Sequence, residues 1–226
     1  MPFSSVGAIS PEAYDTWYQT QRGRWIGNAE YRLLVRLLAP QTGETLLDAG
    51  CGTGYFTRRF AEGLSGRVVG LDPSAFWTSF ARSHAGSRES YVRGVAEALP
   101  FADGSFDFTV SVAALCFAED ARKAASEIVR VTRRRFAVGL LNRQSLLYRR
   151  KGKDGGSGSY RGAVWHRPRE AKGLFRGLLA TDLSVRTAVF LPSGNPWARG
   201  AERLLPSFLP WGGLLVVSGR GGSRDG

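Results

Sequence analysis

The sequence predicts an α/β fold in which helices cover both faces of a doubly wound sheet. Apolar, strand-like runs alternate with amphipathic helical segments over much of the chain. The first run, 44–49, leads into a turn with glycines at 50, 52 and 54, and the next, 67–72, ends in an acid. Glycines let a backbone approach a ligand closely, and a carboxylate can accept hydrogen bonds from a ribose. These features together indicate an adenosine-binding sheet edge.

Two helices are expected before the sheet. Pro11 to Thr20 follows Ser10, a favourable cap, and Trp25 to Ala39 carries an apolar stripe that ends at Pro40. Later strands are expected at 91–92, 106–112 and 136–141, with helices near 53–64, 74–84 and 118–132. The alternation predicts parallel strands joined by helical crossovers.

The second half of the chain is less regular. Residues 142–166 include KGKDGGSGS, which predicts a flexible basic loop, either a lid that orders over the site or a mobile surface segment. A helix is expected over 168–179, strands at 182–191 and 214–218, and a helix near 197–205 within an insertion. We expect one domain over 1–219, with a helical cap at 1–43, the loop at 142–166, the insertion at 192–212 and a disordered tail at 220–226.

Three ordered motifs carry a family resemblance over roughly residues 10 to 141. Asp48 to Gly54 reads DAGCGTG, Gly94 to Asp107 reads GVAEALPFADGSFD, and Glu127 to Val131 reads EIVRV. This series resembles the class I S-adenosylmethionine (SAM)-dependent methyltransferases, in particular the small-molecule type 11 group. The resemblance implies a Rossmann-like seven-stranded sheet, mostly parallel with an antiparallel last strand. It also implies SAM as the cofactor.

The resemblance assigns cofactor roles to individual residues. Asp72 would hold the ribose hydroxyls, or else cap the helix that follows Pro73. Glu97 would either flank the adenine or be solvated, and the carbonyls near Val112 and Ala113 would receive the methionine ammonium. The expected cofactor residues are Tyr14, Trp17, Arg24, Asp48, Ala49, Gly50, Cys51, Gly52, Gly54, Asp72, Pro73, Ala96, Glu97, Val112 and Ala113.

Candidate catalytic and substrate residues lie outside these motifs. Tyr14, Trp17 and Arg24 resemble the lid of small-molecule members, where Arg24 would pair with the cofactor carboxylate or be solvated. His166 is the best candidate for a general base, and Tyr14 is the second catalytic candidate. The candidate substrate residues are Cys116, Phe117, Asn142, Arg143, Tyr148, Tyr160 and Trp165. Cys116 and His166 also have structural interpretations, since cysteine is a common core residue and a lone histidine is more often structural.

Two departures from the family pattern also stand out. Val95 occupies a position where the family often has an acid that bonds adenine. Arg133 to Arg135 replace turn glycines, so the fifth strand is expected to begin after a tight, basic connection.

Composition restricts the remaining possibilities. The chain has 226 residues and a net charge of +12, and residues 130–176 hold fourteen of its basic residues against two acids. A basic segment attracts anionic partners. No apolar run of eighteen residues occurs, the first ten residues do not resemble a signal peptide, and two cysteines form neither a disulfide framework nor a zinc pattern. We therefore expect a cytoplasmic, metal-free protein with no membrane partner.

Three functions fit this sequence. The first is methyl transfer to a small polar or anionic metabolite. The second is RNA methylation with segment 130–176 as the nucleic-acid surface, which predicts a steep salt dependence of RNA binding. The third is a non-catalytic SAM-binding regulator. The sequence does not determine the oligomeric state.

Overall fold

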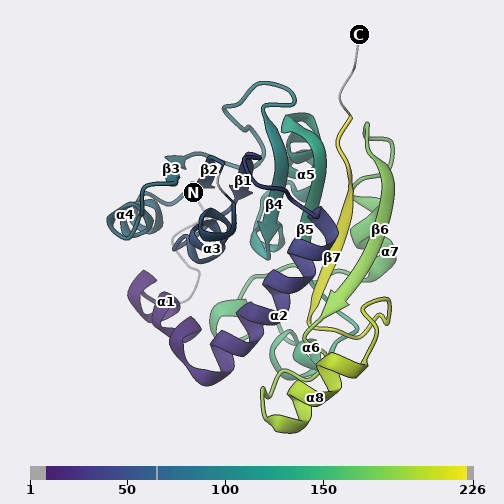
Figure 1. Cartoon of the computed structure of the whole chain (residues 1–226). Helices are drawn as coiled ribbons and strands as arrows, with labels where there is room; N and C mark the ends of the chain where they lie inside the picture. The colour runs from purple at the N-terminus through teal and green to yellow at the C-terminus, as the bar shows by residue number, and fades with distance from the viewer. Residues whose placement is uncertain (1–8, 65, 223–226) are drawn as a thin grey trace.

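A computed structural model describes residues 9–64 and 66–222. Its core is a seven-stranded sheet in the order β3-β2-β1-β4-β5-β7-β6 (Figure 1). The first five strands pair in parallel, and β7 runs antiparallel to both of its neighbours. This arrangement confirms the predicted Rossmann-like fold class.

The elements follow one another with short connections. The strands are β1 (Leu46–Ala49), β2 (Val68–Asp72), β3 (Glu89–Arg93), β4 (Phe106–Val112), β5 (Thr132–Leu141), β6 (Thr181–Ala188) and β7 (Leu214–Arg220). The α-helices are α1 (Pro11–Gln19), α2 (Gln21–Leu38), α3 (Tyr55–Gly63), α4 (Ala75–Ser83), α5 (Ala121–Val131), α6 (Leu146–Lys151), α7 (Pro168–Gly173) and α8 (Pro196–Leu204). Two 3₁₀ turns, η1 (Ala114–Cys116) and η2 (Gly158–Tyr160), complete the described part.

Helices pack on both faces of the sheet (Figure 1). On one face, α2 and α3 bury Leu34 and Phe60 against Phe108. On the other, α5 and α7 pack over the sheet, and Phe136 stacks on Phe175 with ring centroids 5.0 Å apart. Burying large apolar side chains on both faces stabilises the sheet. The carboxyl ends of β1, β2 and β4 meet at one edge, where the predicted site lies.

The two N-terminal helices meet at a sharp corner. Ser10 caps α1, as expected, and Thr20 caps α2 by accepting a hydrogen bond from the N–H of Gly23 at 3.0 Å. A Cβ on Gly23 would stand 2.0 Å from the carbonyl oxygen of Trp17. Only glycine fits there, so α2 starts at Gln21 rather than at Trp25.

Two further boundary predictions are wrong. The fifth strand begins at Thr132, directly after α5, with no intervening connection. Its first residues are fixed by ion pairs of Arg133 with Asp107 and of Arg134 with Glu44. The helix expected over 168–179 ends at Gly173.

The segment 142–166, expected as a flexible basic loop, contains the helix α6 and the 3₁₀ turn η2. Its flexibility stays a prediction. Ser145 caps α6 by accepting from the N–H of Tyr148 at 3.1 Å. The N–H of Val164 donates to the carbonyl oxygen of Cys116 at 2.8 Å. The insertion contains α8, close to the predicted helix. Arg220 belongs to β7, whereas 223–226 and 1–8 lie outside the described residues. None of the described helices is long and apolar enough to cross a membrane.

Candidate functional site

The turn after β1 accepts only glycine at two of its positions. Gly50, Gly52 and Gly54 have φ values of +83°, +53° and +80°, a region that disfavours residues with a Cβ. A Cβ on Gly50 would stand 2.1 Å from the Cβ of Ala114, and one on Gly54 would stand 2.4 Å from the hydroxyl of Tyr91. The absence of side chains at Gly50 and Gly54 therefore permits both the positive φ values and the close packing against Ala114 and Tyr91.

Asp72, at the end of β2, is hydrogen-bonded to this turn. Its Oδ2 accepts from the N–H of Gly52 at 3.0 Å, and its Oδ1 accepts from the N–H of Ser74 at 2.9 Å. The second contact stabilises the entry to α4, as the capping interpretation expects. Each carboxylate oxygen can accept more than one hydrogen bond, so Asp72 can also bind a diol. Burial raises its pKa.

Asp48, in β1, stabilises the glycine turn that follows this strand. It is buried, and its Oδ2 accepts from the hydroxyl of Thr57 at 2.7 Å. Burial raises the pKa of Asp48 to about 7. Because Thr57 lies in α3, this bond ties the strand to the helix that follows the turn. Asp48 thus orders the glycine turn from within.

The groups around the turn fit an adenosine-bearing cofactor. The ring of Trp77 lies 3.4 Å from the position of a Cβ on Gly52, and Tyr14 packs edge-on against Trp77 with centroids 5.2 Å apart. An aromatic surface, a carboxylate and an exposed backbone are what a nucleoside needs. Asp72 would take the ribose of SAM. The carbonyl of Ala113, a residue with a φ of +60°, would take the ammonium.

Other expected cofactor residues have their own contacts. Glu97 accepts a hydrogen bond from the N–H of Glu119 at 3.0 Å, which fixes the approach to α5. The carbonyl of Pro73 accepts from Arg93 at 3.1 Å. The guanidinium of Arg24 is exposed and donates to the carbonyl oxygen of Gln19 at 2.7 Å. Arg24 thus contacts the C-terminal end of α1, and its pairing with the cofactor carboxylate stays a prediction.

Sequence reasoning missed a carboxyl group on the inner side of α2. Burial is the main cause that raises the pKa of Tyr14, Tyr18 and Tyr160, and the charge of Glu30 adds to the shift of each. Burial raises the pKa of Glu30 to about 8, with Glu202 adding a smaller effect. One signal in the sequence could have revealed it. Glu30 lies one helical turn from both Ile26 and Leu34, which are buried, so it shares their face of α2.

The hydroxyl of Tyr14 lies 3.4 Å from that of Tyr18, whose ring stacks on Tyr55 at 3.6 Å between centroids. The charge of Asp48 also raises the pKa of Tyr14. Tyr14 therefore lies between Tyr18 and Trp77, whose ring adjoins Gly52 of the glycine turn. We call Tyr14, Tyr18, Glu30 and Tyr160 the tyrosine–glutamate cluster.

Aromatic side chains of the 142–166 segment, which include candidate substrate residues, form one group. Trp165 packs against Tyr148 and Tyr160, with ring centroids 5.3 and 5.6 Å apart. The guanidinium of Arg143 lies over the ring of Tyr148 at 5.8 Å. A Cβ on Gly152 would stand 2.3 Å from Tyr148. Since Tyr160 belongs to both groups, this aromatic group adjoins the tyrosine–glutamate cluster.

Two candidate substrate residues make structural contacts. Cys116 is fully buried, and its sulfur accepts from the N–H of Leu141 at 3.2 Å; burial raises its pKa to about 12. Asn142 is also buried. Its amide donates to the carbonyl oxygens of Pro210 and Gly212, both at 2.8 Å. Both side chains make contacts within the fold, which favours a structural role, and their assignment to the substrate stays a prediction. Phe117, partly buried, packs against the same core.

His166 lies at the end of β5, where it bridges to Asn142. It is buried, and burial lowers its pKa although Glu170 opposes the shift. Across residues 9–64 and 66–222, no hydrogen bond or ion pair joins His166 to Tyr14 or Asp72. The structure places Tyr14 beside the glycine turn through its contact with Trp77, and the role of His166 as a base stays a prediction.

Comparisons with known proteins agree with this geometry. A family model described as a methyltransferase domain matches residues 47–135. Malonyl-[acyl-carrier protein] O-methyltransferase of Pectobacterium atrosepticum is 38% identical over 122 residues, which cover 53% of this chain and 44% of that protein. The chain therefore spans less than half the length of this relative.

Solved structures extend the likeness to nearly the whole chain. A Thermotoga maritima SAM-dependent methyltransferase, named as a possible histamine N-methyltransferase, is 26% identical with a TM-score of 0.71, covering 93% of this chain and 95% of that one. The geranyl diphosphate C-methyltransferase of Streptomyces coelicolor, solved with S-adenosyl-L-homocysteine, has a TM-score of 0.63 at 16% identity. That likeness covers 85% of this chain and 75% of that one and concerns the fold.

Proposed function

Because the chain belongs to the class I SAM-dependent methyltransferases, we propose that it methylates a small polar or anionic metabolite at a deprotonated oxygen. The observation that carries the proposal is the pair of tyrosine hydroxyls, Tyr14 and Tyr18, beside the glycine turn, on which the charge of Glu30 also acts. The names of the malonyl-[acyl-carrier protein] methyltransferases support an acidic acceptor.

The chemistry of the cluster suits an anionic acceptor. SAM supplies an electrophilic methyl group when bound. Below its pKa of about 8, Glu30 is neutral and can donate a hydrogen bond, as can the hydroxyls of Tyr14 and Tyr160. Burial raises the pKa of Tyr160 to about 12, and the charge of Arg22 opposes this rise, so a cation acts on the same hydroxyl. These groups would orient a carboxylate towards the cofactor side of the pocket.

A carboxylate acceptor needs no general base because it carries no proton at neutral pH. The role of the chain is then to align the acceptor and to exclude water. On this account Tyr14 and Glu30 contact the acceptor, and the expected role of His166 as a base is unnecessary. Residues 1–219 would act as one unit, with 1–43 as a cap that contributes both side chains.

RNA methylation has weaker support. Arg130 pairs with Asp103 and Glu127, while Arg133 and Arg134 pair with Asp107 and Glu44. Part of the charge of the 130–176 segment is therefore neutralised within the chain. A steep salt dependence of RNA binding would still favour this alternative.

The test combines the purified chain with SAM labelled in its methyl group and an extract separated into metabolite, RNA and protein fractions. We expect label in the metabolite fraction, in a form that mild alkali releases as methanol, as a methyl ester requires. Label in RNA would establish the alternative. Bound SAM without transfer to any fraction would indicate a regulator. Asp72→Ala, which should not bind SAM, serves as the blank.

A further inference from the structure

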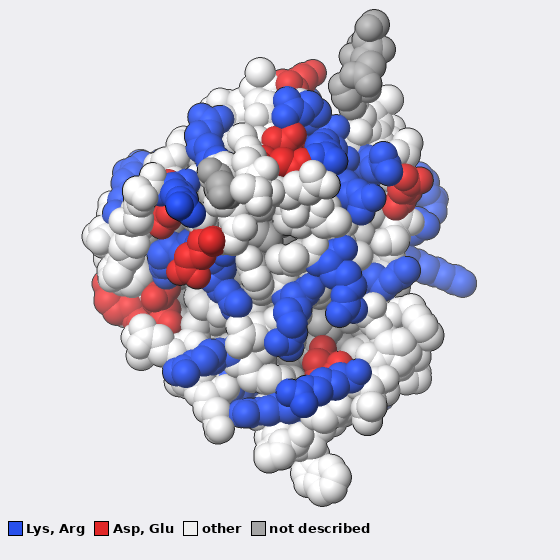
Figure 2. All heavy atoms as spheres, viewed as in Figure 1, with Lys and Arg blue, Asp and Glu red and all other residues white. Residues whose placement is uncertain are grey.

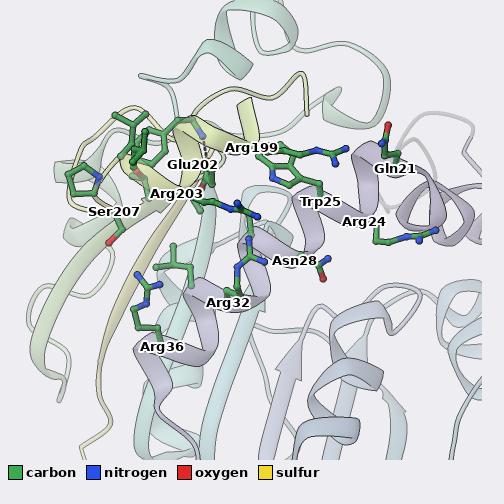
Figure 3. A pocket seen from close by; sticks show the side chains of 18 residues that line it. Gln21, Arg24, Trp25, Asn28, Arg32, Arg36, Arg199, Glu202, Arg203 and Ser207 are labelled. Carbon is green, nitrogen blue, oxygen red and sulfur yellow. Dashed lines mark hydrogen bonds between the residues drawn. The ribbon is translucent and has the colours of Figure 1, made fainter. Parts of the chain in front are cut away.

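A groove of about 930 Å³ runs between α2 and α8 on the outer side of the cap (Figure 3). The arginines of this groove form two rows, one on each helix. Within a row, neighbouring arginines are four or eight residues apart in the sequence. The basic lining residues are Arg24, Arg32 and Arg36 of α2, and Arg199 and Arg203 of α8. On α2 the row spans twelve residues, which is about 18 Å along the helix.

These arginines lack acidic partners within the described chain. In residues 9–64 and 66–222, no ion pair involves any of the five. The acid of the groove, Glu202, has its carboxylate oxygens on the N–H groups of Val189 and Phe190, at 2.8 and 2.9 Å. Figure 3 shows Arg32 and Arg203 extending towards one another across the groove. Like charges that face each other favour an anionic partner between them.

The same region exposes large apolar side chains. Leu204 lines the groove and is 84% exposed, and Trp197, seven residues earlier on α8, is 85% exposed. Phe208, next to the groove residue Ser207, is 68% exposed. Single exposed apolar residues are ordinary, but a cluster beside a charged groove marks an interaction surface. Tryptophan and arginine are also the residue types enriched at protein interfaces.

We propose that the α2–α8 groove docks an amphipathic helix of a partner protein that carries acidic side chains on one face and apolar ones beside them. Carboxylates one helical turn apart match the spacing of the arginine rows. Trp197, Leu204 and Phe208 would cover the apolar face of that helix. Figure 2 shows Lys and Arg gathered over α2 on this side of the molecule.

Other occupants fit less well. A second copy of this chain would bring equally basic surfaces together, given the net charge of +12. A single-stranded RNA could satisfy the arginines and stack on Trp197, but it would leave the aliphatic wall of Leu204, Leu205 and Pro206 without an apolar partner. The mixed lining therefore favours a protein helix.

The test uses a synthetic peptide of about 16 residues, enough for four helical turns. It carries glutamate at i and i+4 positions and leucine alongside, with a fluorophore at one end. A scrambled peptide of the same composition is the first control. Binding is followed by fluorescence anisotropy at about 150 mM salt with wild type, the double variant Arg32→Glu/Arg203→Glu, Trp197→Ser and Arg88→Glu. Arg88 is exposed before β3, outside the groove.

We expect the patterned peptide to bind wild type at least about fivefold more tightly than the scrambled one. The double variant should weaken binding at least about tenfold and Trp197→Ser about threefold, with Arg88→Glu within about twofold. Unchanged SAM affinity would show that each variant is folded. No binding to wild type, or equal binding of both peptides, would overturn the proposal. So would a uridine 12-mer that binds more tightly than the peptide and is released by the double variant.

Discussion

The glycine turn and the tyrosine–glutamate cluster are neighbours, but they are built differently. The turn depends on the absence of side chains, since a Cβ on Gly50 would stand 2.1 Å from Ala114. The cluster depends on side chains contributed by separate segments, α1, α2 and η2. A backbone site leaves a motif in the sequence, whereas a site assembled from distant side chains does not. Changes to the turn should therefore affect cofactor binding and folding, and changes to the cluster should affect acceptor use and its pH dependence.

The largest effect is expected for Gly50→Ala. Its φ of +83° and the 2.1 Å contact with Ala114 both oppose a Cβ. Together they should lower the free energy of unfolding by about 3 kcal/mol or more. Gly43→Ala is the matched control, because Gly43 has a φ of +91° but nothing within 4 Å of its Cβ position. Gly43→Ala should lower the free energy of unfolding, measured in urea, by only about 1–2 kcal/mol. Equal losses for both variants would remove the steric part of the argument.

Glu30→Gln should change the pH dependence of stability. Between the usual pKa of 4.5 and about 8, the unfolded chain ionises Glu30 while the folded chain keeps its proton. Wild type therefore loses stability as pH rises through this window, by a few kcal/mol as an order of magnitude. The glutamine variant lacks this loss. Its free energy of unfolding, measured in urea, should therefore rise relative to that of wild type between pH 5 and pH 9. Glu62→Gln, an exposed control on α3, should run parallel to wild type.

The same variant bears on catalysis. Ionised Glu30 would repel an anionic acceptor, so wild-type methyl transfer should fall as pH rises through about 8. In Glu30→Gln this fall should disappear, while SAM affinity stays constant. A fall of the same size in both proteins would remove Glu30 from the acceptor pocket.

A smaller effect is expected for Gly152→Ala. The new Cβ would stand 2.3 Å from Tyr148 and 2.7 Å from Trp165, so both rings must move. This should cost about 1–3 kcal/mol and reduce methyl transfer, with SAM affinity within about twofold. Gly173→Ala, with nothing within 4 Å, is the control and should be neutral or slightly stabilising. Weakened SAM binding in Gly152→Ala would mean that the aromatic group also forms part of the cofactor site.

The smallest effect is expected for His166→Gln. His166 has no described contact with the cluster, so methyl transfer should change by less than about threefold, as expected for a residue without a catalytic role. A loss of about a hundredfold would restore His166 as the general base. Thermal unfolding of the same sample separates such a loss from a folding defect.

The sequence predicted what short-range patterns determine. Apolar periodicity located the strands, and the glycine turn with Asp72 indicated where a nucleoside could bind. Strand β5 began early because Arg133 and Arg134 pair with acids far away in the chain, which no local pattern shows. Glu30 was overlooked for a similar reason, since its partners Tyr14 and Tyr160 come from other segments.

The distribution of charge along the sequence also differs from its distribution on the surface. The basic excess of the sequence lies in 130–176, yet Arg130, Arg133 and Arg134 have acidic partners. The arginines of the α2–α8 groove come from outside this segment, where basic and acidic residues are equal in number. Only the packing of α8 beside α2 brings them together. A run of charge along the chain therefore does not establish a charged surface.

The most direct test of the central claim is a calorimetric titration of SAM into wild type, Asp72→Ala and Glu30→Gln. We predict that Asp72→Ala loses at least about a hundredfold in affinity, because its carboxylate holds the glycine turn and, on our proposal, would also hold the ribose. Glu30→Gln should bind SAM within about twofold of wild type. Wild-type affinity in Asp72→Ala would contradict the assignment of the cofactor site.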